Sequence, residues 1–314
     1  ATCSSEMRPD CAALRSIDGL QLGDLNSAAL FVEATAWQMD ALMADGRTAD
    51  SIKPAEEART VADGVLEKRP GHMMALRARG LLLSNFGDIE NERLRFKASI
   101  PFYAAAARDY ESYVKVDAGN TITWNNLAAQ QMSLGLMTEG TGNPREGLKH
   151  LRAAARAASQ GGLTPVRASN AAGVWWHIAR VETDLGNHES ARAALAENRR
   201  LLELAYRDAP EGSFRRGRLS TIADENEAAV AFRRGEFASA RDRAFDVARR
   251  YERLKTETPV QKRLRADNLS ETLELAGLAA YMLRDYATAE SAARRAVEAA
   301  KERTPPGNVF QKVD

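Results

Sequence analysis

The sequence feature that most constrains the fold is a pair of small-residue positions that recur at an interval of 49 residues in the last third of the chain. The first position is occupied by Ala179, Ala228 and Gly277, and the second by Ala191, Ala240 and Ala289. A tight-turn sequence separates the two positions in each copy. A repeat period of this size is characteristic of stacked supersecondary units. We therefore expect an array of similar units.

The residue types between these positions favour helices. Ala, Arg, Leu and Glu fill most of the chain, and runs of β-branched or aromatic residues with strand-like alternation are missing. Small residues that face each other let two antiparallel helices, called helix A and helix B of each unit, approach closely. Extending the spacing toward the N-terminus gives Gly80 and Ala128 on helix A, and Ala58, Ala106 and Gly147 on helix B.

The spacing predicts an all-α chain of about six antiparallel helix pairs with long helices. We predict an N-terminal cap or tail over residues 1–23, a repeat domain over residues 24–303 and a C-terminal tail over residues 304–314. In the first three pairs, we expect extra length in insertions between helix A and helix B. The clearest of these insertions are residues 87–101 and 135–143.

Three segments resemble the tetratricopeptide repeat. Trp124 to Ala128 and Trp175 to Ala179 are similar to the opening of that family's helix A, and Arg284 to Ala289 is similar to its turn into helix B. The resemblance covers roughly residues 25–302, although the family repeat has about 34 residues and this period is nearer 49. It implies an α-α superhelix, a right-handed solenoid in which helices A line a concave groove.

The family's groove positions, carried onto this chain, imply a mixed polar and apolar wall that suits an amphipathic helix or an extended peptide. The candidates are Arg77, Asn125, Trp176, Arg180, Asp184, Glu225, Phe232 and Tyr281. Leu278 and Met282 hold further positions on the wall of the last pair. An alternative for Phe232, Leu278 and Tyr281 is packing against the neighbouring unit. The resemblance thus implies a protein or peptide partner.

Charge and motif content argue against several other functions. The 44 basic and 43 acidic residues leave a net charge of +1, which gives no electrostatic footprint for nucleic acid. No apolar run is long enough to span a membrane. The sequence contains no phosphate loop, dinucleotide fingerprint, nucleophile elbow or His/Cys metal spacing. We therefore predict a protein without catalytic activity, cofactor or metal site.

The two cysteines, Cys3 and Cys11, bear on the cellular compartment. They are either two unrelated thiols in a polar terminus or the two ends of a small disulfide loop. A disulfide is typical of an oxidising compartment such as a periplasm, so the pair slightly favours an exported location over the cytoplasm.

The leading functional hypothesis is a scaffold or adaptor that binds a protein or peptide in the groove, as a sensory or assembly domain of a larger bacterial protein. The bacterial assignment follows from abundant Ala and a strong excess of Arg over Lys. A second hypothesis is a closed array that binds a small signalling molecule or peptide in a pocket lined by tryptophans, namely Trp37, Trp124, Trp175 and Trp176. An all-helical enzyme is the least favoured hypothesis.

Overall fold

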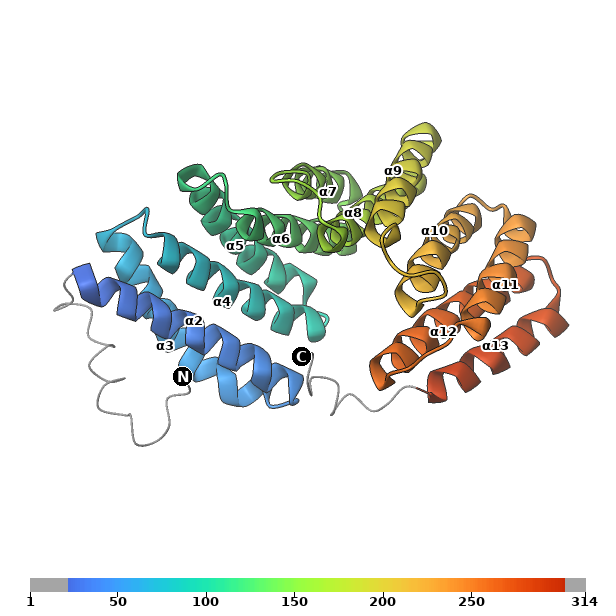
Figure 1. Cartoon of the computed structure of the whole chain (residues 1–314), viewed down its shortest axis with the longest axis horizontal. Coiled ribbons are helices and arrows are strands. Elements are labelled where there is room, and N and C mark those ends of the chain that lie inside the picture. The colour runs from blue at the N-terminus through green and yellow to red at the C-terminus, as the bar shows by residue number, and fades with distance from the viewer. Residues whose placement is uncertain (1–21, 303–314) are drawn as a thin grey trace. The chain divides into compact units, whose positions relative to one another are not determined.

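The computed structural model describes residues 22–302, which form twelve helices and no strand; Cys3 and Cys11 lie outside this range. The helices are α2 (Leu22–Ala44), α3 (Thr48–Lys68), α4 (Met73–Glu92), α5 (Phe96–Val116), α6 (Thr121–Gly140), α7 (Pro144–Ala158), α8 (Pro165–Asp184), α9 (His188–Tyr206), α10 (Phe214–Arg233), α11 (Phe237–Arg253), α12 (Pro259–Met282) and α13 (Tyr286–Lys301). Consecutive helices pack as antiparallel pairs, from α2 with α3 to α12 with α13 (Figure 1). These pairs confirm the predicted all-α helical-repeat fold.

The helix pairs are grouped into two compact units. The N-terminal unit ends at Gly162 and contains the three pairs from α2 to α7. The C-terminal unit begins at Leu163 and contains the three pairs from α8 to α13. The repeat domain predicted over residues 24–303 stays a prediction. None of the described helices combines the length and the apolar character needed to cross a membrane.

Every turn from helix A to helix B closes in the same way. The second residue before helix B has a positive φ, and the N–H of the next residue donates to the carbonyl group five positions earlier. This Schellman arrangement favours glycine, because a left-handed backbone is costly for residues that carry a Cβ. Glycine takes the position in four of the turns, at Gly46, Gly142, Gly186 and Gly235. Leu94 and Arg284 take it in the other two, with φ values of 58° and 63°.

We predict that Leu94→Gly stabilises the protein. Leu94 is 77% exposed, so its removal sacrifices little buried surface. Glycine avoids the cost of about 1–2 kcal/mol for a left-handed L-residue, and its extra freedom in the unfolded chain offsets part of this gain. The free energy of unfolding, measured in urea, should rise by about 0.5–1 kcal/mol. Leu94→Ala shortens the same side chain but keeps the Cβ, so an equal gain in both variants would contradict this explanation.

The predicted small positions lie where the two helices of a pair touch. Ala191 and Ala240 are completely buried, and Ala289 is partly buried. In the pair formed by α6 and α7, a Cβ added to Gly147 would lie 2.6 Å from the carbonyl oxygen of Gly135. The two backbones are therefore in direct contact with no side chain between them, which is the close approach that the spacing predicted.

The insertions predicted over residues 87–101 and 135–143 are wrong. Helices α4 and α5 are separated by three residues only, and so are α6 and α7. Gly87 and Gly135 lie inside helices, where the missing side chain leaves room for an atom of the paired helix. A Cβ added to Gly87, for example, would lie 2.7 Å from the ring of Tyr103. The extra length of the repeat therefore lies in the helices themselves.

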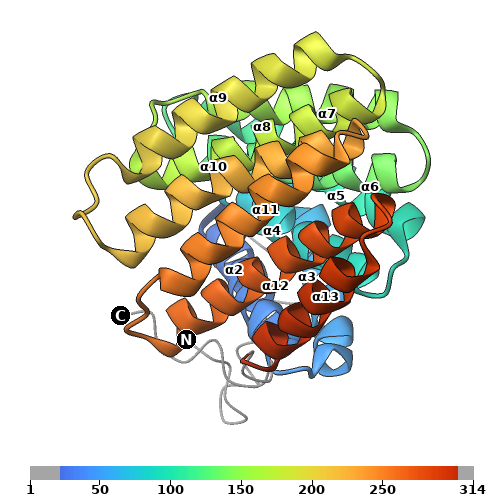
Figure 2. The same cartoon turned by 90° about the vertical axis from the view of Figure 1, so that its right-hand side faces the viewer.

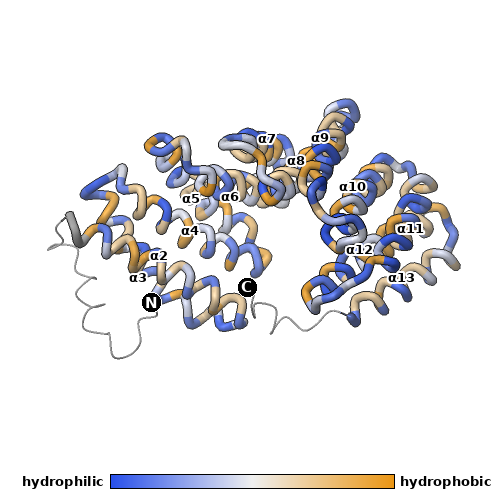
Figure 3. Tube along the Cα trace, viewed as in Figure 1, coloured by the Kyte–Doolittle hydropathy of each residue, from blue (hydrophilic) through white to orange (hydrophobic). Residues whose placement is uncertain are grey.

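The core of each unit lies between helices that each have an apolar and a polar side. Hydrophobic and hydrophilic positions alternate along the helices, as Figure 3 shows. Tyr103 and Tyr110 of α5 and Tyr251 of α11 are among the largest side chains that are fully buried. Buried amides add polar links between neighbours: Nδ2 of Asn198 on α9 donates to the carbonyl oxygen of Ala172 on α8 at 2.7 Å. The packed core fixes the orientation of the helices that carry the exposed side chains.

Candidate partner-binding face of the C-terminal unit

The helices A of the C-terminal unit form one layer. Helix α10 packs against both α8 and α12, whereas α9, α11 and α13 make at most marginal contact with one another. Figure 2 turns this unit toward the viewer. Neighbouring helix pairs are thus closer together at helices A than at helices B, which curves the stack of pairs within this unit. Helices α8, α10 and α12 therefore lie on its inner side. Its inner face is defined here by their exposed residues Asp184, Arg233, Leu278, Tyr281 and Met282.

An exposed apolar cluster occupies the α12 part of the inner face. Leu278, Tyr281 and Met282 are 56%, 60% and 51% exposed, respectively. Their spacing of three and four residues places them on one side of the helix. Tyr281 packs edge to face against Tyr286, with the ring centroids 5.6 Å apart. A contiguous exposed group of large apolar side chains is typical of an interaction surface.

A salt bridge joins equivalent positions of two neighbouring helices A. Nη1 of Arg233 on α10 lies 2.7 Å from both carboxylate oxygens of Asp184 on α8. Met282 occupies the same position one repeat later. Both partners are about one-third exposed, and exposed pairs contribute only about 0–1 kcal/mol to stability. The pair can therefore open toward a charged ligand at small cost.

Phe232 packs within the unit instead of lining the inner face. Its ring lies edge to face against Phe237, with the centroids 5.4 Å apart. It also contacts a cluster of buried alanines from α10, α11 and α12. Packing against the neighbouring helix pair, here through Ala279 of α12, is the alternative that the sequence left open for Phe232. Leu278 and Tyr281, for which the same alternative was open, are exposed.

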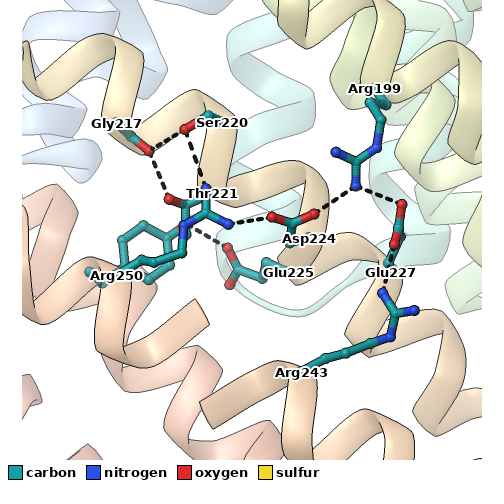
Figure 4. A network of polar contacts seen from close by, with 10 residues as sticks. Arg199, Gly217, Ser220, Thr221, Asp224, Glu225, Glu227, Arg243 and Arg250 are labelled. Atoms are coloured by element: carbon teal, nitrogen blue, oxygen red, sulfur yellow. Dashed lines mark hydrogen bonds and ion pairs between the residues drawn. The ribbon is translucent and has the colours of Figure 1, made fainter. Parts of the chain in front are cut away.

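Glu225 is also engaged inside the unit. Its carboxylate accepts hydrogen bonds from the hydroxyl of Tyr251 on α11, at 2.7 Å, and from the hydroxyl of Thr272 on α12, at 3.0 Å. Figure 4 shows the side chain of Glu225 beside that of Thr221. Removal from water raises the pKa of Glu225 to about 7, although both hydrogen bonds act in the opposite direction. This predicted groove residue therefore links three helices of the unit.

The remaining predicted groove residues are less exposed than those of α12. Trp176 and Arg180 of α8 are partly buried. In the N-terminal unit, Arg77 of α4 pairs with Glu33 of α2 at 2.6 Å, and Asn125 of α6 is partly buried. Six of the eight predicted residues thus belong to the C-terminal unit, and the other two belong to the N-terminal unit.

The tryptophans proposed to line a pocket have separate environments within their units. On α2, Trp37 is 57% exposed. The indole N–H of Trp124 donates to the backbone carbonyl of Ala118 at 2.8 Å. Trp175 and Trp176 of α8 are partly buried. Between residues 22 and 302, no three His, Cys, Asp or Glu side chains gather in a way that suits a metal ion.

A network of arginines was not expected from the sequence. Arg199 of α9 donates to Asp224 at 2.6 Å and to Glu227 at 2.7 Å, both on α10 (Figure 4). Arg243 and Arg250 of α11 bind the same two carboxylates, Arg243 that of Glu227 and Arg250 that of Asp224. Arg199 lies 25 and 28 residues from its partners, so no local pattern in the sequence reveals the network.

Comparison with known proteins supports the fold. No family model and no curated protein sequence matches the chain. The crystal structure of BtubC (BKLC) from P. vanneervenii is similar, with a TM-score of 0.55 and 17% identity over 84% of this chain and 96% of that chain. The apo form of RapI has a TM-score of 0.49 and 11% identity, covering 94% of this chain and 89% of its own. The apo form of the quorum sensor NprR from B. thuringiensis has a TM-score of 0.45 and 16% identity, covering 94% and 71%. The likeness to BtubC concerns the fold alone, which is an all-α helical repeat.

Proposed function

We propose that this chain is a non-catalytic, tetratricopeptide-like adaptor that binds a protein or peptide partner on the inner face of its C-terminal unit. The observation that carries the proposal is the exposed apolar cluster of Leu278, Tyr281 and Met282 on α12. Met282 holds the position on α12 that Asp184 and Arg233, which form a salt bridge, hold on the neighbouring helices A. A short amphipathic helix or an extended segment matches such a surface.

The chemistry of the cluster supports a protein partner. Tyrosine and methionine are enriched at the centres of protein interfaces, and methionine adapts its shape to different partners. Covering one large apolar side chain that is half exposed contributes on the order of 1 kcal/mol. The adjoining Asp184 and Arg233 offer both charge signs to the partner, and such rim charges govern orientation and specificity more than affinity.

A pair of variants tests the inner face. Tyr281→Ala combined with Met282→Ser should reduce recovery of partner proteins from cross-linked lysate of the source cells by about tenfold or more, as loss of a central interface side chain does. The matched control is Val297→Ser, because Val297 is 60% exposed but lies on α13, outside the inner face. Quantitative mass spectrometry of the captured proteins measures the effect. Equal recovery by wild type and the double variant would contradict the proposal.

A further inference from the structure

A second candidate site is a cleft in the C-terminal unit that shares no residue with the inner face. It has a volume of about 380 Å³ and lies between α9, α10 and the first turns of α11. Its apolar lining consists of Leu195 and Ala196 from α9 and of Val230 and Ala231 from α10. The volume falls within the range of pockets that hold small ligands or side chains of a partner.

The charged lining of the cleft is unbalanced toward positive charge. Four arginines line it, Arg192, Arg199, Arg234 and Arg243, whereas the acidic lining residues are Glu227 and Glu236. Glu227 is already bound by two of these arginines, at 2.7 Å and 2.8 Å. Arg199 is further neutralised by Asp224. The network therefore pairs Arg199 and Arg243 with carboxylates, and the charges left to determine what the cleft attracts are those of Arg192, Arg234 and Glu236, with one net positive charge.

These two arginines have unused hydrogen-bonding capacity. Arg192 is exposed and makes no hydrogen bond or ion pair with any residue between 22 and 302. Arg234 donates one bond, from Nη2 to the carbonyl oxygen of His188 at 3.3 Å. Its Nε is buried and has no hydrogen-bond partner among the described residues. A guanidinium carries five N–H donors, so the remaining Nη donors of Arg234 and those of Arg192 can pair with an anionic acceptor in the cleft.

The start of α11 adds to the positive potential. The helix begins at Phe237, and its N-cap residue Glu236 makes no side-chain hydrogen bond to the first turn. The N–H groups of that turn carry the partial positive charge of the helix dipole. Ser239 of the same turn lines the cleft. The helix end and the two arginines thus favour the same sign of ligand charge.

We propose that this cleft binds an acidic segment of a protein, in which one apolar side chain lies between carboxylates. The apolar side chain would occupy the floor formed by Leu195, Ala196 and Val230, and the carboxylates would pair with Arg192 and Arg234. The apolar floor favours such a segment over a free inorganic anion, which has no group to place there. The net charge of +1 gives no support for a nucleic acid ligand. This site is independent of the proposed inner-face function.

Binding of a defined peptide tests the site. The probe is Asp-Glu-Leu-Glu-Asp with fluorescein on its amino terminus and an amidated carboxyl terminus, and its affinity for the full chain is measured by fluorescence polarisation. Arg192→Gln combined with Arg234→Gln should weaken binding by about tenfold or more, because two charged hydrogen bonds are lost. Ala196→Glu, which keeps both arginines, should weaken binding comparably by adding a carboxylate to the floor.

Matched controls separate this site from general attraction. Arg253→Gln removes another exposed arginine of α11, one that does not line the cleft, and should leave affinity unchanged. Asn-Gln-Leu-Gln-Asn should bind weakly because it lacks charge, and Asp-Glu-Ser-Glu-Asp because it lacks the apolar side chain.

The proposal is overturned if wild type does not bind the acidic peptide, if the neutral or the serine peptide binds as tightly, or if the cleft variants match wild type. Competition by millimolar inorganic phosphate as effective as that by unlabelled acidic peptide would also overturn it, in favour of a small-anion site. Tyr281→Ala should leave this binding intact, so failure of one proposed site does not imply failure of the other.

Discussion

Gly147→Ala is expected to lower the free energy of unfolding by about 2 kcal/mol. The added Cβ would lie 2.6 Å from the carbonyl oxygen of Gly135 and 3.1 Å from the backbone nitrogen of Glu139. Backbone atoms do not rotate aside as the end of a flexible side chain does, so α6 and α7 would have to separate. Alanine is intrinsically better than glycine inside a helix by about 1 kcal/mol, which offsets only part of this cost.

Gly173→Ala provides the matched control, because Gly173 also lies inside a helix. A Cβ added there meets no atom within 4 Å, so only the gain in helix propensity remains. We expect its free energy of unfolding to rise by about 0.5–1 kcal/mol. Urea unfolding followed by circular dichroism measures both variants. Stabilisation in both cases would mean that α6 and α7 do not make the backbone contact described above.

The periodic part of the fold could be predicted because one physical constraint recurs in every repeat. Ala191 and Ala240 are completely buried at the same point of successive helix pairs, so their equal spacing in the sequence records equal packing in space. Stacked repeats make mostly neighbouring contacts, and such contacts leave a regular trace in the sequence. The order and pairing of the helices therefore follow from the spacing alone.

Helical glycines could not be interpreted in this way. The insertions predicted over residues 87–101 and 135–143 begin at Gly87 and Gly135, which lie inside α4 and α6. Each instead faces a group on the paired helix, such as the ring of Tyr103 beside Gly87. The role of such a glycine is decided by a residue elsewhere in the chain. For the same reason, Leu94 gave no sign that it occupies a left-handed turn position in which four other turns have glycine.

The same distinction applies to the candidate sites: the repeat predicts some positions, and contacts with residues elsewhere in the chain decide others. Tyr281 is exposed, and its assignment to the groove, which follows from its position in the repeat, stays a prediction. The engagement of Glu225 by Tyr251 and Thr272 depends on contacts with α11 and α12. The cleft likewise forms only where residues of α9, α10 and α11 come together, so the spacing of the repeat does not predict it.

Glu225→Gln should make the protein more stable than wild type at pH 8 by about 2–3 kcal/mol, and this advantage should disappear near pH 4.5. The pKa of Glu225 is about 7 in the folded protein, against an ordinary value of 4.5. Between these values the folded chain holds a proton that the unfolded chain has lost. The contribution of Glu225 to stability therefore falls as pH rises from 4.5 to 7 and is constant above that range. Glutamine never ionises and escapes this loss.

Glutamine also suits the position of Glu225. Its carbonyl oxygen can accept from Thr272, and its amide N–H can donate to the hydroxyl oxygen of Tyr251. Burial lowers the pKa of His177 to about 4, which makes stability rise with pH over part of the same range. Because that histidine is present in both proteins, the difference between variant and wild type isolates Glu225. Urea unfolding at pH 5, 6, 7 and 8 measures this difference, and a constant offset across the series would contradict a raised pKa.

Tyr251→Phe changes the pKa of Glu225 without removing its carboxyl group. The tyrosine hydroxyl donates to Glu225 and lowers its pKa, against the larger effect of burial. Without that donor, the pKa of Glu225 should rise further, so stability should continue to fall with pH above 7. Combining Tyr251→Phe with Glu225→Gln should remove this additional dependence. A titration of the Glu225 carboxyl carbon by NMR follows the same proton directly. If its midpoint stays unchanged in Tyr251→Phe, the hydroxyl of Tyr251 does not stabilise the carboxylate.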